Sequence, residues 1–425
     1  MANHIPQVNQ LGTLKHSAPV KQKVRNSFKM PKLFDRFNLP LLVTVGVLAT
    51  FGLIVCYSAT SGNEEYAFSR QVMGLVIGLI ACSFFFRFDH RFFARLTIPL
   101  LVISVILILS PHLPFIGVSA MGAKSWIRLG IQFQPGEFAK VTVILFAASL
   151  VARSGGQVAS LKEYCKTVGL LAIPFVCILT QPDLGTGLVY LVISAIVLIA
   201  GGARWRYIIA TILVVVGAFI AILIIDEVIK TQASDGTWEY KLLKNYQRSR
   251  LFVFMNQDSA DTSSEAYNLQ QAMIAIGRGG IFGKGLFAST QSSLGFLPEA
   301  PTDFIFCVLA EELGFMGSLF LIGLYAALLL ITLYIGRNSS NLFGMLLCLG
   351  VSGMWLFQVI ENIGMCCGVM PITGIPLPFV SYGSSFMIVN FACVGLVANV
   401  YRTSTDGGIN AKSGKDVKYA KTQRH

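Results

Sequence analysis

The sequence predicts an all-α polytopic membrane protein with ten transmembrane helices. Of its 425 residues, 54% are hydrophobic and only 13% are charged, whereas a soluble domain carries roughly a quarter charged residues. Apolar stretches of bilayer length recur between residues 39 and 401. Lys and Arg gather in alternate connecting segments, which indicates one consistent orientation for the bundle. A single bundle therefore accounts for most of the chain.

The predicted spans are runs of apolar residues bounded by polar or charged ones. They cover residues 39–58, 68–86, 93–110, 137–153, 165–180, 185–201, 207–225, 303–336, 343–369 and 384–401. The eighth and ninth are longer than a bilayer requires, so these two helices are expected to tilt or to extend beyond the membrane.

The distribution of basic residues indicates that both chain ends are cytoplasmic. The segments that follow the second, fourth, sixth and eighth spans are rich in Lys and Arg, as are both tails, and such segments stay in the cytoplasm. Residues 111–136 are an exception, because they carry Lys and Arg on the predicted outer side. The expected organisation is a basic cytoplasmic tail at 1–37, a ten-helix membrane domain at 38–402 and a second basic cytoplasmic tail at 403–425. A large extracytoplasmic loop at 226–302 joins spans seven and eight.

The net charge of +12 resides mainly in the two tails. A basic tail can bind nucleic acid, but beside membrane spans it more simply attracts anionic lipid. We therefore expect membrane lipids, and no nucleic acid, as partners of the tails.

Two outer segments are expected to fold against the bundle. Residues 267–277 place apolar side chains at i, i+3, i+4 and i+7, which predicts an amphipathic helix in an interfacial or re-entrant element. Residues 370–383 contain three prolines and two glycines, which exclude a helix, yet they are apolar. A rigid, folded-in loop that lines a cavity fits both properties.

Asp303 is the leading candidate for chemistry. It follows Pro301 and Thr302 at the predicted start of the eighth span, where a carboxylate that enters hydrocarbon is expensive and usually functional. The alternative is a capping role, since the first helical turn favours a negative charge. Deeper polar groups are expected to support the structure through interhelical hydrogen bonds rather than to react: Glu311, Glu312, Glu361 and Asn362.

Further charged residues are predicted at the same, outer end. Glu137 and Lys140 share one helix face, either as the wall of an outward-facing cavity or as a local ion pair. Asp183 lies in a tight turn and either faces that cavity or bonds the amides of its own turn. Arg278 and Lys284 stand in a glycine-rich run that can bind phosphate oxygens, with a solvated loop as the alternative.

These motifs, taken together, resemble the SEDS family (shape, elongation, division and sporulation) of polytopic peptidoglycan polymerases. The matching motifs are residues 122–127, 134–140, 181–186, 296–304, 310–314 and 371–385. Residues 283–291 and 372–378 are more similar to the elongation member, RodA, than to the division member, FtsW. The chain departs from the family pattern at Gly136, Pro301 and Ser384, where the family usually has Ser, His and Gly.

The resemblance implies an inverting peptidoglycan glycosyltransferase that polymerises lipid II, an undecaprenyl-diphosphate-linked disaccharide pentapeptide. The reaction would take place at the outer face of the bacterial cytoplasmic membrane, for cell elongation and shape or, alternatively, for division. A class B penicillin-binding protein is the implied partner. Two other functions stay open: a flippase for the lipid-linked precursor, and a non-catalytic scaffold for a penicillin-binding protein.

The resemblance also implies roles for individual residues. Asp303 would act as the general base or as a ligand of Mg²⁺ or Mn²⁺, with no organic cofactor. The residues expected to bind the diphosphate are Lys124, Arg128, Lys140, Arg278 and Lys284. Those expected to organise the cavity are Trp126, Glu137, Asp183, Glu299, Thr302, Ser381 and Tyr382.

Overall fold

A computed structural model gives the structure of most of the chain. It describes residues 38–61, 66–114, 117–120, 123–129, 131–155, 158, 160–181, 183–232, 238–240 and 264–422. The predicted tail at 1–37 and much of the predicted outer loop, residues 233–237 and 241–263, lie outside the described residues, as do the last three residues of the tail at 403–425.

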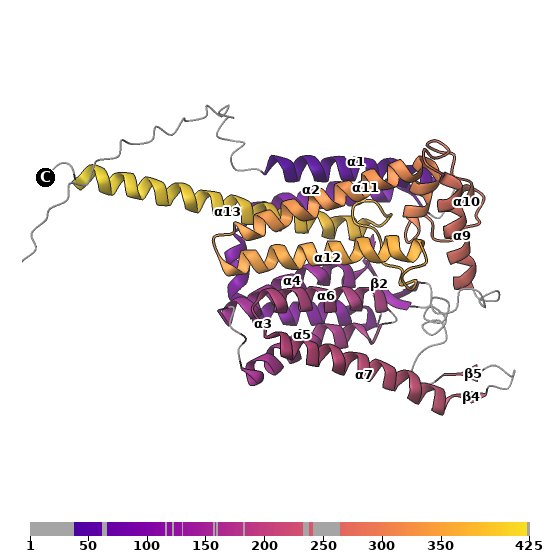
Figure 1. Ribbon diagram of the computed structural model, residues 1–425, viewed down its shortest axis with the longest axis horizontal. Coiled ribbons are helices and arrows are strands. Elements are labelled where there is room, and N and C mark those ends of the chain that lie inside the picture. Colours follow the sequence, from indigo (N-terminus) through magenta and orange to yellow (C-terminus); the bar gives the residue numbers. More distant parts are fainter. Residues whose placement is uncertain are drawn as a thin grey trace, which may run out of the picture.

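The described chain is a bundle of helices whose long axes run side by side (Figure 1). A helix occupies each of the ten predicted ranges: α1 (Leu39–Thr60), α2 (Phe68–Arg87), α3 (Thr97–Leu109), α4 (Pro135–Arg153), α5 (Leu161–Ile178), α6 (Leu184–Ala200), α7 (Trp205–Ile229), α11 (Ile305–Arg337), α12 (Leu342–Cys366) and α13 (Ser384–Thr422). Within the described residues, seven helices are long and apolar enough to cross a membrane, namely α1, α2, α4, α7, α11, α12 and the first part of α13. The apolar helices that include α3 and α6 are shorter.

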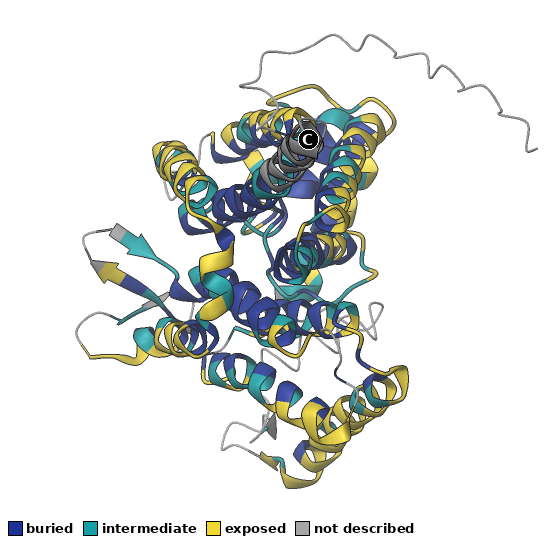
Figure 2. Ribbon diagram, turned by 90° about the vertical axis from the view of Figure 1, so that its left-hand side faces the viewer, coloured by how far each residue is buried: buried dark blue, intermediate teal, exposed yellow. Residues whose placement is uncertain are grey.

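The middle of the bundle is formed by α4, α12 and the first part of α13, which are mostly buried, whereas α7 is almost entirely exposed. Figure 2 shows the exposed residues on the outside of the bundle and the buried ones inside it. Small residues allow the closest approach: a Cβ on Gly74 of α2 would lie 2.6 Å from the Cα of Ser384 on α13. Such contacts replace the hydrophobic driving force that helices lack in lipid.

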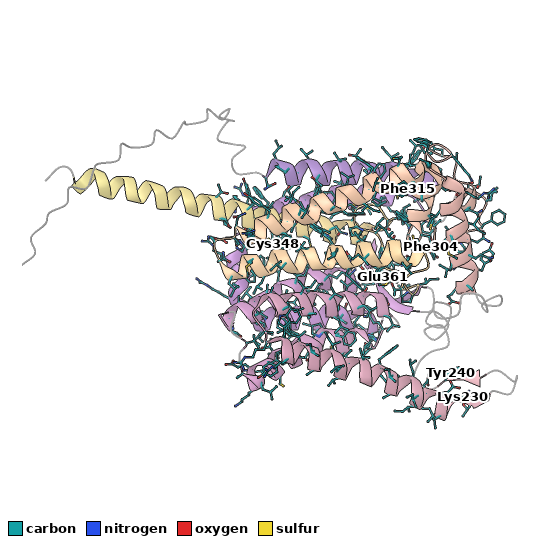
Figure 3. All side chains as sticks on the ribbon, in the orientation of Figure 1. Lys230, Tyr240, Phe304, Phe315, Cys348 and Glu361 are labelled. Atoms are coloured by element: carbon teal, nitrogen blue, oxygen red, sulfur yellow. The ribbon has the colours of Figure 1, made fainter. Side chains whose placement is uncertain are left out.

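Both described ends of the bundle lie on one side. α1 begins, and α13 leaves the bundle, at the end opposite to α9 (Ser264–Gly279) and α10 (Thr290–Ser293) (Figure 1). We refer to the end that carries α9 and α10 as the α9 end. Figure 3 places Phe304 and Glu361 toward the α9 end and Cys348 toward the other.

The helix α11 is broken near the α9 end. Gly314 has φ 65° and ψ −162°, so Ile305–Leu313 forms a short helix of its own. The break frees carbonyl groups, which the segment after α9 satisfies: Lys284 N donates to Glu311 O at 3.0 Å and Gly285 N donates to Glu312 O at 2.9 Å. A Cβ on Gly314 would collide with the backbone of Gly283. Glycine is therefore required where this segment crosses the helix.

The all-α membrane bundle is confirmed, and the connection between α3 and α4 adds a small sheet that was not predicted. This connection contains an antiparallel sheet of β1 (Gly117–Ala120), β2 (Ala123–Leu129) and β3 (Ile131–Phe133), in that order. Along β2 the side chains of Ser125 and Ile127 are buried and that of Arg128 is exposed, which is the alternation expected of a strand with one covered face. Two residues each from β4 (Thr231–Gln232) and β5 (Trp238–Glu239) pair after α7.

The amphipathic helix predicted at 267–277 is present as α9. Leu269 and Ala272 are buried and Ile276 is partly buried, whereas Met273 is 40% exposed. α9 packs against α11. It therefore lies over the short helix that follows Asp303.

Candidate active site

A cavity of about 380 Å³ opens among α2, β2, α4, the turn before α11 and the segment before α13. This size is within the usual range of small-molecule sites. Eight of the predicted site residues line it: Trp126, Glu137, Lys140, Asp183, Glu299, Thr302, Asp303 and Tyr382. Residues from distant parts of the sequence thus converge on one hollow.

Asp303 lies in a turn that precedes the helix it was predicted to begin. α11 starts at Ile305 with Phe304 as its N-cap, and this N-cap has no side-chain hydrogen bond. The turn is closed instead by the carbonyl of Glu299, which accepts the N–H groups of Thr302 and Asp303 at 3.2 and 3.0 Å. The prediction that Asp303 lies in the first helical turn is therefore wrong. Its N–H is bonded within the preceding turn, and the helix begins only at Ile305.

The proline-rich segment forms the wall next to Asp303. Gly374 has φ 73°, and a Cβ built on it would lie 2.9 Å from Asp303 Oδ2. The Asn362 side-chain amide donates to Asp303 O and to Ile375 O, both at 2.8 Å, and so ties the turn to this segment. Ser381 Oγ donates to Thr302 O at 2.6 Å. Ser381 itself does not line the cavity.

Glu137 and Lys140 form a buried ion pair that is also part of the cavity wall. Lys140 Nζ donates to Glu137 Oε1 at 2.6 Å, and the two side chains are 1% and 5% exposed. Lys140 Nζ also lies 5.4 Å from the ring centroid of Phe386. Glu137 Oε2 and Ser125 Oγ are buried without a hydrogen-bond partner among the described residues. Both expected arrangements, ion pair and cavity wall, are thus present together.

Asp183 connects two elements of the site. Its Oδ1 accepts Thr186 N at 2.9 Å and caps α6, which is the alternative predicted for this turn. Its Oδ2 accepts Gln134 Nε2 at 3.1 Å, just before α4. The carboxylate therefore joins the start of α6 to the start of α4 while it lines the cavity.

Tyr66 and Arg70 are among the cavity residues that the sequence did not single out. The Tyr66 hydroxyl donates to Glu299 Oε2 at 2.6 Å, and its ring meets that of Tyr382 edge to face at 5.2 Å. Burial raises the pKa of Tyr382, which keeps its hydroxyl protonated, and this hydroxyl donates to Ala67 O at 3.2 Å. An aromatic residue and a basic residue beside the second predicted span carried no signal of their own, since belt aromatics and basic span ends are common.

Of the predicted diphosphate-binding residues whose side chains the structure describes, only Lys140 lines the cavity. Arg128 and Arg278 are exposed and do not line it. The side chain of Lys124, in β2, lies outside the described residues. Lys284 Nζ donates to Glu311 and, at 2.9 Å, to Thr290 Oγ1.

The deeper carboxylates hold segments together, as expected. Glu311 is fully buried and, besides Lys284, accepts Thr290 Oγ1 at 2.6 Å, Ser289 Oγ at 3.3 Å and Gln291 N at 3.2 Å. Glu312 accepts Ser58 Oγ of α1. Glu361 accepts Thr373 Oγ1 of the proline-rich segment. Glu311 and Glu361 thus pin connecting segments to the bundle, whereas Glu312 links two of its helices.

The site offers few ligands for a metal ion. No group of three His, Cys, Asp or Glu side chains suited to a metal occurs among the described residues. Asp303 and Glu299 nevertheless present carboxylate oxygens to one cavity. This set suits Mg²⁺ or Mn²⁺ only if substrate oxygens and water supply the remaining ligands, which is how Mg²⁺ is usually bound.

Comparison with known proteins places this architecture in a family. The FtsW/RodA/SpoVE family model, described as "cell cycle protein", matches residues 36–406. The peptidoglycan glycosyltransferase MrdB of Escherichia coli is 35% identical over 87% of this chain and 95% of its own length. The peptidoglycan glycosyltransferase RodA of Treponema pallidum is 32% identical over 86% and 97%.

Solved structures agree. A chain from a peptidoglycan synthase complex that coordinates polymerisation and crosslinking has a TM-score of 0.69 and 29% identity, over 87% of this chain and 98% of that one. RodA of Thermus thermophilus has a TM-score of 0.62 and 28% identity, over 86% and 97%. The chain belongs to the FtsW/RodA/SpoVE family, that is, to the SEDS proteins whose motifs its sequence carries.

Proposed function

We propose that this protein is a peptidoglycan glycosyltransferase that polymerises lipid II, with Asp303 as the general base. The observation that supports it is the cavity in which Asp303, Glu137 and Lys140 converge, in a chain whose relatives bear the name peptidoglycan glycosyltransferase. The similarity to MrdB and RodA supports a role in elongation and cell shape, with division as the alternative.

In the proposed reaction, the 4-hydroxyl of one lipid II molecule attacks the anomeric carbon of another. Asp303 accepts the hydroxyl proton, which a positioned carboxylate can do effectively. The bond from the anomeric carbon to the diphosphate breaks in the same displacement, so the configuration inverts. Lys140 and Arg70, which both line the cavity, offset the charge of the departing diphosphate.

A divalent cation fits this scheme as an accessory. Asp303, with Glu299 as a neighbour, would hold Mg²⁺ or Mn²⁺, and substrate phosphate oxygens would complete its coordination. The cation would lower the charge of the leaving diphosphate. The proton-accepting role of Asp303 is the one that we propose as primary.

The membrane arrangement is part of the proposal. All ten helices in the predicted ranges cross the cytoplasmic membrane, with both tails inside and the α9 end outside. α1 begins and α13 leaves the bundle at the same end, which supports an even number of crossings. Because one structural neighbour comes from a peptidoglycan synthase complex, we further propose a crosslinking partner, a class B penicillin-binding protein.

The test is polymerisation of lipid II by purified Asp303→Asn and Asp303→Ala protein. Asn keeps the size of the side chain and removes the base, so we expect the loss of at least two orders of magnitude in rate that removal of a general base causes. Asp89→Asn, at the opposite end beside η2 (His90–Arg95), is the matched control, since Asp89 is exposed there. Polymer from folded Asp303→Asn at the native rate would refute the assignment. Movement of labelled lipid II across vesicles without polymer would favour a flippase.

A further inference from the structure

We infer that the hydrogen bond between Tyr66 and Glu299 positions Asp303. The inference depends on the proposed function, in which Asp303 accepts the proton. Tyr66 lies in the connection between α1 and α2, far from Asp303 in the sequence. Its hydroxyl nevertheless reaches Glu299 Oε2 at 2.6 Å, on the turn that carries Asp303.

Glu299 controls the shape of that turn through its backbone. Its carbonyl accepts Asp303 N at 3.0 Å, and also Thr302 N and Thr302 Oγ1 at 3.2 and 3.1 Å. Its φ is 54°, a conformation that residues other than glycine adopt rarely. The unfavourable backbone persists only if surrounding contacts hold it in place.

The side chain of Glu299 supplies such contacts. Oε2 accepts the Tyr66 hydroxyl and, at 3.1 Å, Thr302 Oγ1. Hydrogen bonds to a charged group are among the stronger ones in proteins. Glu299 is therefore held at its carbonyl by the turn and at its carboxylate by Tyr66.

Tyr66 is itself held by a residue of the segment before α13. Its ring meets the Tyr382 ring edge to face at 5.2 Å and 86°, and Tyr382 N donates to Pro301 O at 2.9 Å. Two segments thus enclose the turn: the α1–α2 connection and the segment before α13. Removal of the Tyr66 hydroxyl would loosen this enclosure without removing a side chain from it.

The decisive variant is Tyr66→Phe, which keeps the ring contact with Tyr382 and deletes only the donor. We expect kcat for lipid II polymerisation to fall roughly tenfold, because small misplacements of a reacting group are costly, and KM to change less than about twofold. Glu299→Gln keeps an oxygen acceptor for the Tyr66 hydroxyl, so it should lower kcat less than Glu299→Ala does. Adding Tyr66→Phe to Glu299→Ala should lower kcat no further, since the hydroxyl then has no carboxylate to hold.

Tyr57→Phe is the matched control, because Tyr57 packs its ring on Phe68 and Phe287 outside the cavity lining. It should leave kcat unchanged. Native kcat for Tyr66→Phe, or a raised KM alone, would overturn the positioning role and leave the proposed function intact. Independent effects in the double variant would overturn it too. If Glu299→Ala fails to fold, the kcat of Tyr66→Phe alone decides whether the positioning role holds. Native activity of Asp303→Asn would instead refute the proposed function.

Discussion

The Asp303 carboxylate lies directly against the backbone of Gly374: Oδ2 is 2.9 Å from the position that a Cβ on Gly374 would occupy. Gly374 also has φ 73°, a conformation that disfavours any side chain. The glycine thus serves two purposes, since it forms the bend and leaves room for the carboxylate.

We therefore predict that Gly374→Ala displaces Asp303. The methyl group must push Oδ2 aside, and the backbone strain adds about 1–2 kcal/mol. Polymerisation of lipid II should fall by roughly tenfold or more. Gly277→Ala on α9 is the control, because a Cβ there meets nothing within 4 Å. Equal activity of both variants would contradict the prediction.

A second prediction concerns the buried pair of Glu137 and Lys140. Lys140→Met leaves the Glu137 carboxylate buried without its partner, which costs about 3–5 kcal/mol. The double variant Glu137→Gln/Lys140→Met removes both charges and should regain most of the lost thermal stability in detergent. Both the single and the double variant should be inactive in polymerisation, because neither has the Lys140 cation at the cavity. Recovery of polymerisation in the double variant would show that the pair is only structural.

A third prediction separates the two interpretations of Lys284. Its contact with Glu311 indicates a structural role, so Lys284→Met should lower the melting temperature and leave KM for lipid II unchanged. Glu311→Ala should be more destabilising, because Thr290 Oγ1, Ser289 Oγ and Gln291 N then lose a buried acceptor. A raised KM for Lys284→Met at native stability would restore the phosphate-binding interpretation.

A fourth prediction is a pH dependence at the end opposite to the cavity. Burial lowers the pKa of His90, whose Nδ1 lies 2.9 Å from Asn399 Oδ1 and whose Nε2 lies 3.2 Å from Asn341 Nδ2. Asp89 counteracts this shift and Arg91 adds to it. A histidine whose pKa is lower in the folded than in the unfolded protein stabilises the fold at pH values above its unfolded pKa, about 6.5. This stabilisation is lost as the pH falls.

The melting temperature of the native protein should therefore drop between pH 8 and pH 5.5 by more than that of His90→Gln, which cannot be protonated. Parallel curves for the two proteins would contradict the role of His90. Arg91 helps to lower the pKa of His90, so Arg91→Gln should show a drop in melting temperature that is smaller than the native one.

Helix positions followed from the sequence because hydrocarbon imposes a simple rule on span length. The residues around Asp303 followed from motifs rather than from physics. What could not be predicted depends on non-local contacts. The turn at Glu299 needs a partner from the α1–α2 connection, and the pairing of β2 with β1 and β3 needs a covered face that only the folded chain supplies. Local propensity carries no record of such partners.

The different surroundings of two predicted basic residues have the same origin. Arg278 and Lys284 stand in one glycine-rich run, and both were candidates for phosphate. The break at Gly314 brings Glu311 to Lys284, whereas Arg278 is exposed and does not line the cavity. Charge type was readable from the sequence, but the direction of each side chain was not.

The break at Gly314 also determines which part of the molecule Asp303 moves with. The short helix behind Asp303 is hydrogen-bonded to Lys284 and Gly285, and the next residues of α11, Phe315 and Met316, are hydrogen-bonded to Gly280 and Ile281. The segment after α9 therefore bridges the break and holds both parts of the helix. We expect that a force applied to this segment, for example by a bound protein, would reach Asp303 through the short helix. Such a force should change the hydrogen exchange of residues 305–313 together with the rate of the site.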